Sequence, residues 1–344
     1  MKRATWKKIA GALAVCLCIM TAFVFTMEPA FAAPVTYNQK GNALKDYNAG
    51  KYKVVKNKKM TRKKYSYAED SGPVLKSIKG YPATFTRYDA GLKSKGVIDP
   101  PYGVSKSTPQ SMAISPDGQI AYIMCVYKGA ASKENSWRGY VVKYSIPQKK
   151  VIKKGPVFTT GHGQAMAINP KNGQLWFVGA PKTVKTNLQQ INTVTLLPVK
   201  RINFKLKSTV PMGNNLAFDK KGNVYFYTRS GGGWAPKNCL KIYKGKIKAK
   251  SVKFKLIMQG IKNPPGPIGQ SLGYNPKSNR LYFVDDGEII SVPVSKLGKL
   301  KPKHVRTTVF GGAREFESIT FDRAGRGYFL TNRPYEIMKV SAGF

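Results

Sequence analysis

Residues 110–118 read Gln-Ser-Met-Ala-Ile-Ser-Pro-Asp-Gly, and residues 121–124 read Ala-Tyr-Ile-Met. The first segment is a short strand of small and apolar residues, its Pro-Asp-Gly end is typical of a tight turn, and the second segment is an aromatic strand. Together they predict a β-hairpin. The same pattern returns along the chain, so this hairpin is the unit that decides the fold.

The pattern recurs four more times. The later copies begin Gln164-Ala-Met-Ala-Ile-Asn-Pro, Asn214-Asn-Leu-Ala-Phe-Asp-Lys, Gln270-Ser-Leu-Gly-Tyr-Asn-Pro and Glu317-Ser-Ile-Thr-Phe-Asp-Arg, and each continues into an aromatic strand. Equivalent positions are separated by 54, 50, 56 and 47 residues. A period of about 50 residues fits a four-stranded blade of a β-propeller.

The fifth copy ends the chain after its third strand, at residues 336–340, and is therefore one strand short. The strand-like segment 82–88, which precedes the first copy, is the natural donor of the missing strand. We therefore predict an all-β fold, a five-bladed propeller over residues 83–344 closed by an N-terminal strand. An open repeat array or a sandwich is the alternative, but a closed ring protects the strand edges better.

The N-terminal segment predicts export. Four cations in residues 1–8, the uncharged apolar run 9–25 and Ala30-Phe31-Ala32 indicate a cleaved signal peptide over residues 1–32, with an uncleaved anchor as the alternative. Cys125 and Cys239 are the only cysteines left after cleavage, and their places in the repeats predict two unpaired thiols. We expect a secreted protein, extracellular or associated with the cell wall.

Residues 33–82 differ from the repeats, with twelve Lys and Arg, three acidic residues and few aliphatic ones. We expect a basic, Lys/Tyr-rich and poorly ordered arm. Its densest stretch is typical of polyanion binding, although a solvated linker is the alternative. The residues predicted to bind a polyanion are Lys56, Lys58, Lys59, Arg62, Lys63 and Lys64.

The charge balance narrows the function classes. The chain carries 59 Lys and Arg against 16 Asp and Glu, a formal net charge of +43, and removing the signal's four cations and Glu28 leaves +40. Like charges this dense indicate an anionic partner such as teichoic acid or another polymer of a bacterial envelope. With two His and sixteen carboxylates, the chain is poor in metal ligands and acid/base groups, which disfavours a metalloenzyme. We expect no cofactor, no metal and a monomer.

The repeat alignment places one polar residue at the entry of each innermost strand, which predicts a ring around the channel mouth. Such amides suit a sugar, or alternatively satisfy backbone groups of the neighbouring blade. His162, Arg314, Glu315 and Glu317 break the symmetry of the ring. Trp234 lies in a glycine-rich loop where it could stack on a sugar. The pair Glu315 and Glu317 also suggests glycoside hydrolysis, a weaker interpretation. The candidate ligand-binding residues are Gln110, His162, Gln164, Asn214, Gln270, Glu317 and Trp234.

Three segments resemble a known family. Residues 161–170, Gly-His-Gly-Gln-Ala-Met-Ala-Ile-Asn-Pro, the copy at 110–118, and Phe310-Gly-Gly with Glu317-Ser-Ile-Thr-Phe are similar to the helveticin J family, the large heat-labile class III bacteriocins of lactobacilli. The resemblance spans about residues 108–344. It implies antibacterial action and supplies no catalytic residue, and the basic arm and the signal depart from it.

These features leave three functions open. The first is a secreted, cationic, non-enzymatic bacteriocin that binds the anionic envelope of other bacteria. The second is an adhesin that teichoic acid retains on the producer's own wall and that binds glycans. The third is a propeller glycosidase or lactonase, which the scarcity of carboxylates disfavours.

Overall fold

The computed structural model describes residues 32–45, 55–56, 76–79, 84–88, 107–179, 185–207, 212, 215–230, 239–262, 269–285, 288–311, 315–332 and 336–342. Pro34–Phe344 forms one compact unit. Its described part contains β-strands β1 to β24 and three short 3-10 helices, η1 (Ala131–Ser136), η2 (Val294–Lys296) and η3 (Pro302–His304). No helix in these ranges has the length and apolar character needed to cross a membrane. Residues 1–31, which hold most of the predicted signal peptide, lie outside the described ranges.

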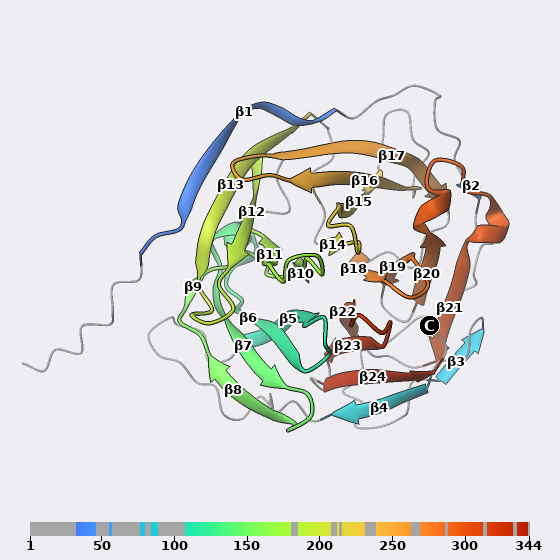
Figure 1. The fold of residues 1–344 in the computed structure, drawn as a ribbon, viewed down its shortest axis with the longest axis horizontal. Helices are drawn as coiled ribbons and strands as arrows, with labels where there is room; N and C mark the ends of the chain where they lie inside the picture. Colours follow the sequence, from blue (N-terminus) through green and yellow to red (C-terminus); the bar gives the residue numbers. More distant parts are fainter. Residues whose placement is uncertain are drawn as a thin grey trace, which may run out of the picture. The chain divides into compact units, whose positions relative to one another are not determined.

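The strands form five sheets, called blades 1 to 5 here (Figure 1). Blade 1 contains β5 (Ser107–Ile114), β6 (Ile120–Tyr127), β7 (Arg138–Ser145) and β8 (Lys150–Lys154), and β9 (Phe158–Thr159) pairs with β7. Blade 2 contains β10 (Met166–Ile168), β11 (Leu175–Val178), β12 (Lys185–Ile191) and β13 (Pro198–Lys207). Blade 3 contains β14 (Ala217–Phe218), β15 (Val224–Ser230), β16 (Cys239–Ile247) and β17 (Val252–Lys262).

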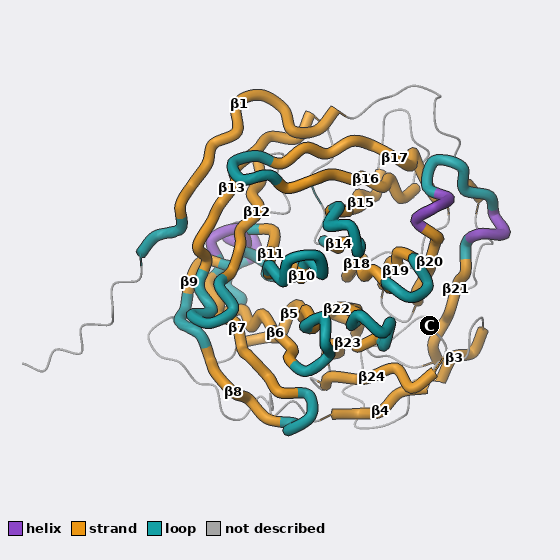
Figure 2. Tube along the Cα trace, in the orientation of Figure 1, coloured by secondary structure: helices purple, strands orange, loops and turns teal. Residues whose placement is uncertain are grey.

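Blade 4 contains β18 (Gly269–Asn275), β19 (Arg280–Asp285), β20 (Glu288–Pro293) and β21 (Arg306–Gly311). Blade 5 contains β22 (Glu315–Phe321), β23 (Gly327–Asn332) and β24 (Glu336–Ala342). The innermost strands β5, β10, β14, β18 and β22 gather around the centre with the turns that follow them (Figure 2). Each innermost strand comes from one sequence repeat, so the all-β, five-bladed propeller is confirmed.

Each interface between neighbouring blades holds its own cluster of buried side chains. Trp176 and Leu188 of blade 2 pack with Phe226 and Tyr243 of blade 3. Four further clusters join blades 3 and 4, 4 and 5, 5 and 1, and 1 and 2. Full burial of one large apolar side chain contributes about 1.5–3 kcal/mol. The core of this fold is therefore a ring of five interfaces, and the aromatic strand of each repeat supplies much of it.

Hydroxyl groups join the innermost strands of neighbouring blades. The backbone N–H of Met112 donates to Ser318 Oγ (3.1 Å), and that of Ile114 donates to Thr320 Oγ1 (3.2 Å). The N–H of Ile319 donates to Ser271 Oγ of blade 4 (3.4 Å). An innermost strand has no strand on its channel side, and a buried N–H without a partner is costly. Short hydroxyl side chains in the repeats therefore satisfy these groups.

The strand β4 (Thr84–Tyr88) completes blade 5. It pairs antiparallel with β24, from Tyr88 opposite Ile337 to Thr84 opposite Ala342. This pairing joins the N-terminal side of the propeller to the last strand of the chain, as the missing strand of the fifth repeat predicts. The closure of the ring between the two ends of the repeat region is therefore confirmed.

Part of the basic arm forms strands on the outer edges of three blades. β1 (Val35–Lys45) lies parallel to β13 of blade 2, β2 (Val55–Lys56) lies parallel to β17 of blade 3, and β3 (Lys76–Lys79) pairs antiparallel with β21 of blade 4. The expectation of a poorly ordered arm missed these strands. A strand added at the edge of a sheet needs backbone partners and few buried side chains. The shortage of aliphatic residues in the basic arm therefore does not prevent these pairings.

Polar side chains add to the contact of β1 with the propeller. Asn203 Nδ2 donates to Asn38 Oδ1 (2.7 Å), and the N–H of Val252 in blade 3 donates to Gln39 Oε1 (3.0 Å). The strand β1 therefore contacts two blades.

Cys125 is a buried, free thiol in β6, and burial raises its pKa to about 12. The side chain of Cys239 lies outside what the structure describes, so the prediction of two unpaired cysteines remains a prediction for Cys239.

Removing the closing strand is expected to destabilise the propeller. A chain lacking residues 33–91 loses β4 and its five register pairs with β24, and at about 1 kcal/mol per net hydrogen bond the loss is about 3 kcal/mol or more. A chain lacking only residues 33–81 keeps β4 and should lose less. Urea unfolding of both chains measures the difference. Equal stability of the two would show that β4 does not close the ring.

Candidate functional site

Four of the five side chains predicted to ring the channel mouth do come together. Gln110 Nε2 donates to Glu317 Oε1 (3.1 Å), and Gln164 Nε2 donates to Glu317 Oε2 (3.1 Å) and to Gln270 Oε1. The exposed fractions of Gln110, Gln164, Gln270 and Glu317 are 1%, 6%, 3% and 1%. The fifth residue, Asn214, lies outside the described residues. We call these four residues the amide–carboxylate cluster.

The cluster joins four blades across the channel. Gln110 belongs to β5, Gln270 to β18 and Glu317 to β22, and Gln164 precedes β10 by two residues. Both oxygens of the Glu317 carboxylate accept amide hydrogens, which is how a buried carboxylate is normally stabilised. Because the amides bond one another and are buried, this geometry favours a structural role over an open ring that receives a sugar.

His162 lies two residues before Gln164 in the sequence and is held by two partners. Its Nδ1 contacts the carboxylate of Glu134, which η1 supplies, and its ring stacks on Trp137 at 5.8 Å and 26°. Glu134 is 8% exposed. A histidine oriented by a carboxylate is a usual component of acid/base sites. The sequence offers no serine or cysteine nucleophile signature to accompany it, and the pair fixes the β6–β7 connection against the Gly161–Gly163 turn.

The remaining predicted site residues are not placed. Trp234, Lys58, Lys59, Arg62, Lys63 and Lys64 lie outside the described residues. Lys56 belongs to β2, whose backbone alone is described. The arm's role in polyanion binding therefore stays a prediction.

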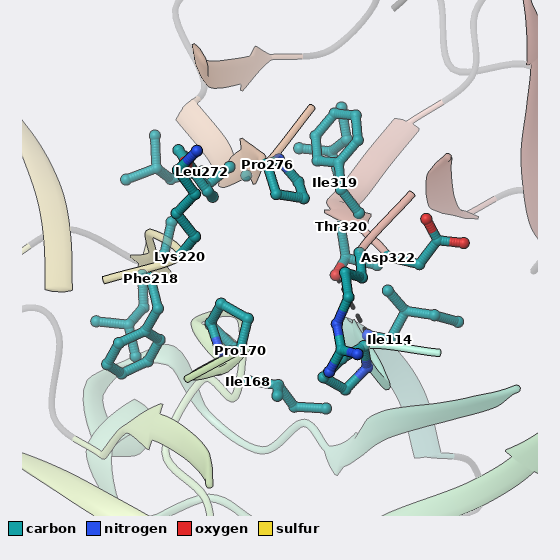
Figure 3. Close-up of a pocket in the computed structure, with 18 of the residues that line it drawn as sticks. Ile114, Ile168, Pro170, Phe218, Lys220, Leu272, Pro276, Ile319, Thr320 and Asp322 are labelled. Atoms are coloured by element: carbon teal, nitrogen blue, oxygen red, sulfur yellow. Dashed lines mark hydrogen bonds between the residues drawn. The ribbon is translucent and has the colours of Figure 1, made fainter. Parts of the chain in front are cut away.

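A cavity opens at the opposite end of the innermost strands (Figure 3). Its volume is about 310 Å³, and all five blades line it. One residue from the end of each innermost strand forms the wall, namely Ile114, Ile168, Phe218, Tyr274 and Phe321. The sequence pattern predicts a site only at the other mouth, where the polar residues align.

A second hollow, the lysine groove, runs along blade 3. Its volume is about 590 Å³, and its apolar surface includes Phe254, Ile257 and Leu297. Five cations line it, and no Asp or Glu is among its described lining residues. These cations are Lys244, Lys246, Lys248, Lys253 and Lys255.

The register of β16 and β17 places these lysines opposite one another. Lys244 is the partner of Lys255, and Lys246 is the partner of Lys253. Directly opposed residues of antiparallel strands share one face of the sheet, and like charges in such pairs are destabilising. The backbone register also places Lys143 opposite Lys153 in blade 1 and Lys185 opposite Lys205 in blade 2. In blade 1, Lys153 Nζ donates to the carbonyl of Val194 (2.9 Å).

An acidic group that contacts two lining residues of the groove is already engaged. Asp219 Oδ2 accepts hydrogen bonds from Tyr225 Oη (2.9 Å) and from Asn223 Nδ2 (2.7 Å). Burial, together with the Asp219 charge, raises the pKa of Tyr225, so this phenol stays protonated. Lys244 Nζ lies 5.6 Å from the centre of the Tyr225 ring. The lysines therefore face the groove next to an aromatic ring and a fully engaged carboxylate.

Comparisons with known proteins support no assignment of family. The chain matches no protein-family model and no curated protein. Its matches among solved structures include hydrazine synthase of Kuenenia stuttgartiensis, with 12% identity, a TM-score of 0.40, and coverage of 69% of this chain and 85% of that chain. They also include a family AA12 carbohydrate-active enzyme of Trichoderma reesei in a calcium structure, with 8% identity, a TM-score of 0.40, and coverage of 80% and 99%. Similarity this low carries no argument about activity.

Replacing the carboxylate of the cluster is expected to destabilise the fold. Glu317→Gln keeps the shape but turns one acceptor into a donor. Either Gln164 then faces a second donor, or Gln110 must turn its amide and give up its hydrogen bond to the Pro109 carbonyl. We expect a loss of about 1–3 kcal/mol in the free energy of unfolding, measured with urea. Unchanged stability with weakened sugar binding would instead support the ligand-binding ring.

Proposed function

We propose that this protein is a secreted, non-enzymatic binder of anionic polymers of bacterial envelopes, such as teichoic acid. The observation that carries the proposal is the pairing of lysines across β16 and β17 in a groove with no acidic residue among its described lining. Such pairs oppose folding. Opposed lysines nevertheless recur on the outer strands of three blades. A bound polymer that carries phosphate groups would neutralise their charge and so explain why they are present.

The shape of the lysine groove suits a polymer segment. Its volume of about 590 Å³ is open along the hairpin, and four of its lysines alternate along the two strands at positions that share one face. A lysine ammonium binds phosphate as a compact point charge, without the fixed geometry that arginine imposes. The groove therefore favours a flexible, repeating anion over one rigid ligand.

Two biological roles follow from the same binding. The resemblance of the repeats to the helveticin J family favours a bacteriocin that attaches to competing cells. The basic arm and the signal peptide favour an adhesin held on the producer's wall. The small number of carboxylates and histidines disfavours a glycosidase or lactonase.

Neutralising the groove is expected to raise stability and to lower binding. In a variant carrying Lys244→Gln, Lys246→Gln, Lys253→Gln and Lys255→Gln, loss of two like-charge pairs should stabilise the fold by about 0.4–2 kcal/mol. Each cation near an anionic surface contributes about 1 kcal/mol, so binding to isolated cell walls should fall at least about tenfold. Binding of the parent protein should also weaken steeply in a salt series, because the Debye length shrinks to about 3 Å at 1 M.

A charge-matched control separates the groove from net charge. It carries Lys149→Gln, Lys299→Gln, Lys301→Gln and Lys303→Gln, four exposed lysines with no lysine opposite them in the described strand pairs. The proposal fails if this control loses as much wall binding as the groove variant, or if walls stripped of teichoic acid bind the parent equally well.

A killing assay distinguishes the two roles. Purified protein is added to related bacteria at concentrations that saturate their walls, and viable cells are counted. Loss of viability supports the bacteriocin, whereas binding without loss of viability supports the adhesin.

A further inference from the structure

The cavity at the turn end of the channel differs in chemistry from the amide–carboxylate cluster at the other end. Aliphatic or aromatic residues form its wall at every blade, and Leu272 and Ile319 add to it. Asp322 also lines the cavity, and its carboxylate is paired with Arg326. The two hydroxyls among its lining residues are engaged, since Thr320 Oγ1 accepts from the Ile114 N–H and Tyr274 Oη bonds to Asn279 Oδ1 (2.9 Å). A cavity with such walls favours a hydrocarbon or aromatic group over water or a sugar.

Cations surround the mouth of this cavity. The residue two places after each wall residue lines the mouth: it is proline in blades 1, 2 and 4, Lys220 in blade 3 and Arg323 in blade 5. Figure 3 shows Lys220 beside Phe218, and Pro170 and Pro276 on neighbouring blades. The residue that follows each of these is an exposed lysine in three blades, namely Lys171, Lys221 and Lys277. In blade 1 it is the acid Asp117. Besides Arg326, which is paired with Asp322, the described turns after the innermost strands therefore carry five exposed cations and one exposed carboxylate.

The other two acids of these turns do not neutralise the mouth. Asp322 is fully buried and accepts from the Arg326 N–H (2.9 Å) and Arg326 Nε, and Asp219 is buried in its own turn. Asp117 accepts hydrogen bonds from Ser115 Oγ and from the Gln119 N–H (3.0 Å), and these bonds, with the charge of Arg323, hold its pKa below the usual value. These carboxylates are hydrogen-bonded within their turns, and Asp117 also offsets part of the charge of Arg323. Lys220 and Arg323 both line the cavity.

We propose that this cavity binds a small amphiphilic anion, with an apolar body of about ten carbon atoms in the channel and a carboxylate or similar head group at Lys220 and Arg323. A volume of about 310 Å³ equals that of about ten water molecules in the liquid, at about 30 Å³ each. That volume lies at the small end of ligand pockets and is too small for a folded polymer segment. The site is separate from the lysine groove and does not depend on the proposed function.

Calorimetric titration with decanoate tests the site, with decylamine as the probe of equal length and opposite charge. We expect decanoate to bind with a stoichiometry of one and at least about tenfold more tightly than decylamine. Ala167→Phe fills the cavity from β10 and should lower decanoate affinity at least about tenfold. Lys220→Gln with Arg323→Gln removes two head-group partners and should lower it about two- to thirtyfold.

The control variant with Lys301→Gln and Lys303→Gln should bind decanoate like the parent. The proposal is overturned if decanoate does not bind, if decylamine binds equally well, or if the Lys220/Arg323 double variant keeps the parent's affinity. The Lys220/Arg323 double variant changes only exposed side chains, so we expect it to fold. It therefore still tests the site if Ala167→Phe does not fold. Wall binding should be unchanged by Ala167→Phe, which separates this site from the lysine groove.

Discussion

The channel-side edge of each innermost strand is the constraint on which the rest of this fold depends. No strand can pair with that edge, so its buried N–H groups need other partners. In blades 1 and 5, serine and threonine of the adjacent blade supply them, as Ser318 does for Met112 and Ser271 does for Ile319. Short side chains at these positions also let the blades approach closely. The aromatic second strands can then meet in five interfacial cores, and the amide–carboxylate cluster ties four blades at one end of the channel.

The propeller could be predicted from the sequence because its signal is repeated. Gln110, Gln164, Gln270 and Glu317 occupy one repeat position, and the structure brings them together. Their burial could not be predicted, because it depends on how closely the blades approach. The strand β4 was predictable from a missing fourth strand, whereas β1 to β3 were not, since they add to edges that were already complete and carry no hydrophobic pattern.

The cavity and the lysine groove also had weak signals. At one position of the repeat alignment, three copies have proline and two have Lys220 and Arg323. This mixture does not indicate a binding site until the structure shows that the five strands converge there. The lysines of residues 244–255 look like a solvated hairpin in the sequence. Only the register, which places Lys246 opposite Lys253, shows that like charges face one another across the strands.

An anionic polymer bound in the lysine groove should offset this repulsion. The most direct test is the thermal unfolding of the full chain in low salt, with purified teichoic acid added in steps. A ligand that binds only the folded state stabilises it by RT ln(1 + [L]/Kd), so the midpoint should rise with each addition. The rise should be much smaller when the four groove lysines 244, 246, 253 and 255 are glutamine. An unchanged midpoint for the parent, or an equal rise in both proteins, would contradict the claim.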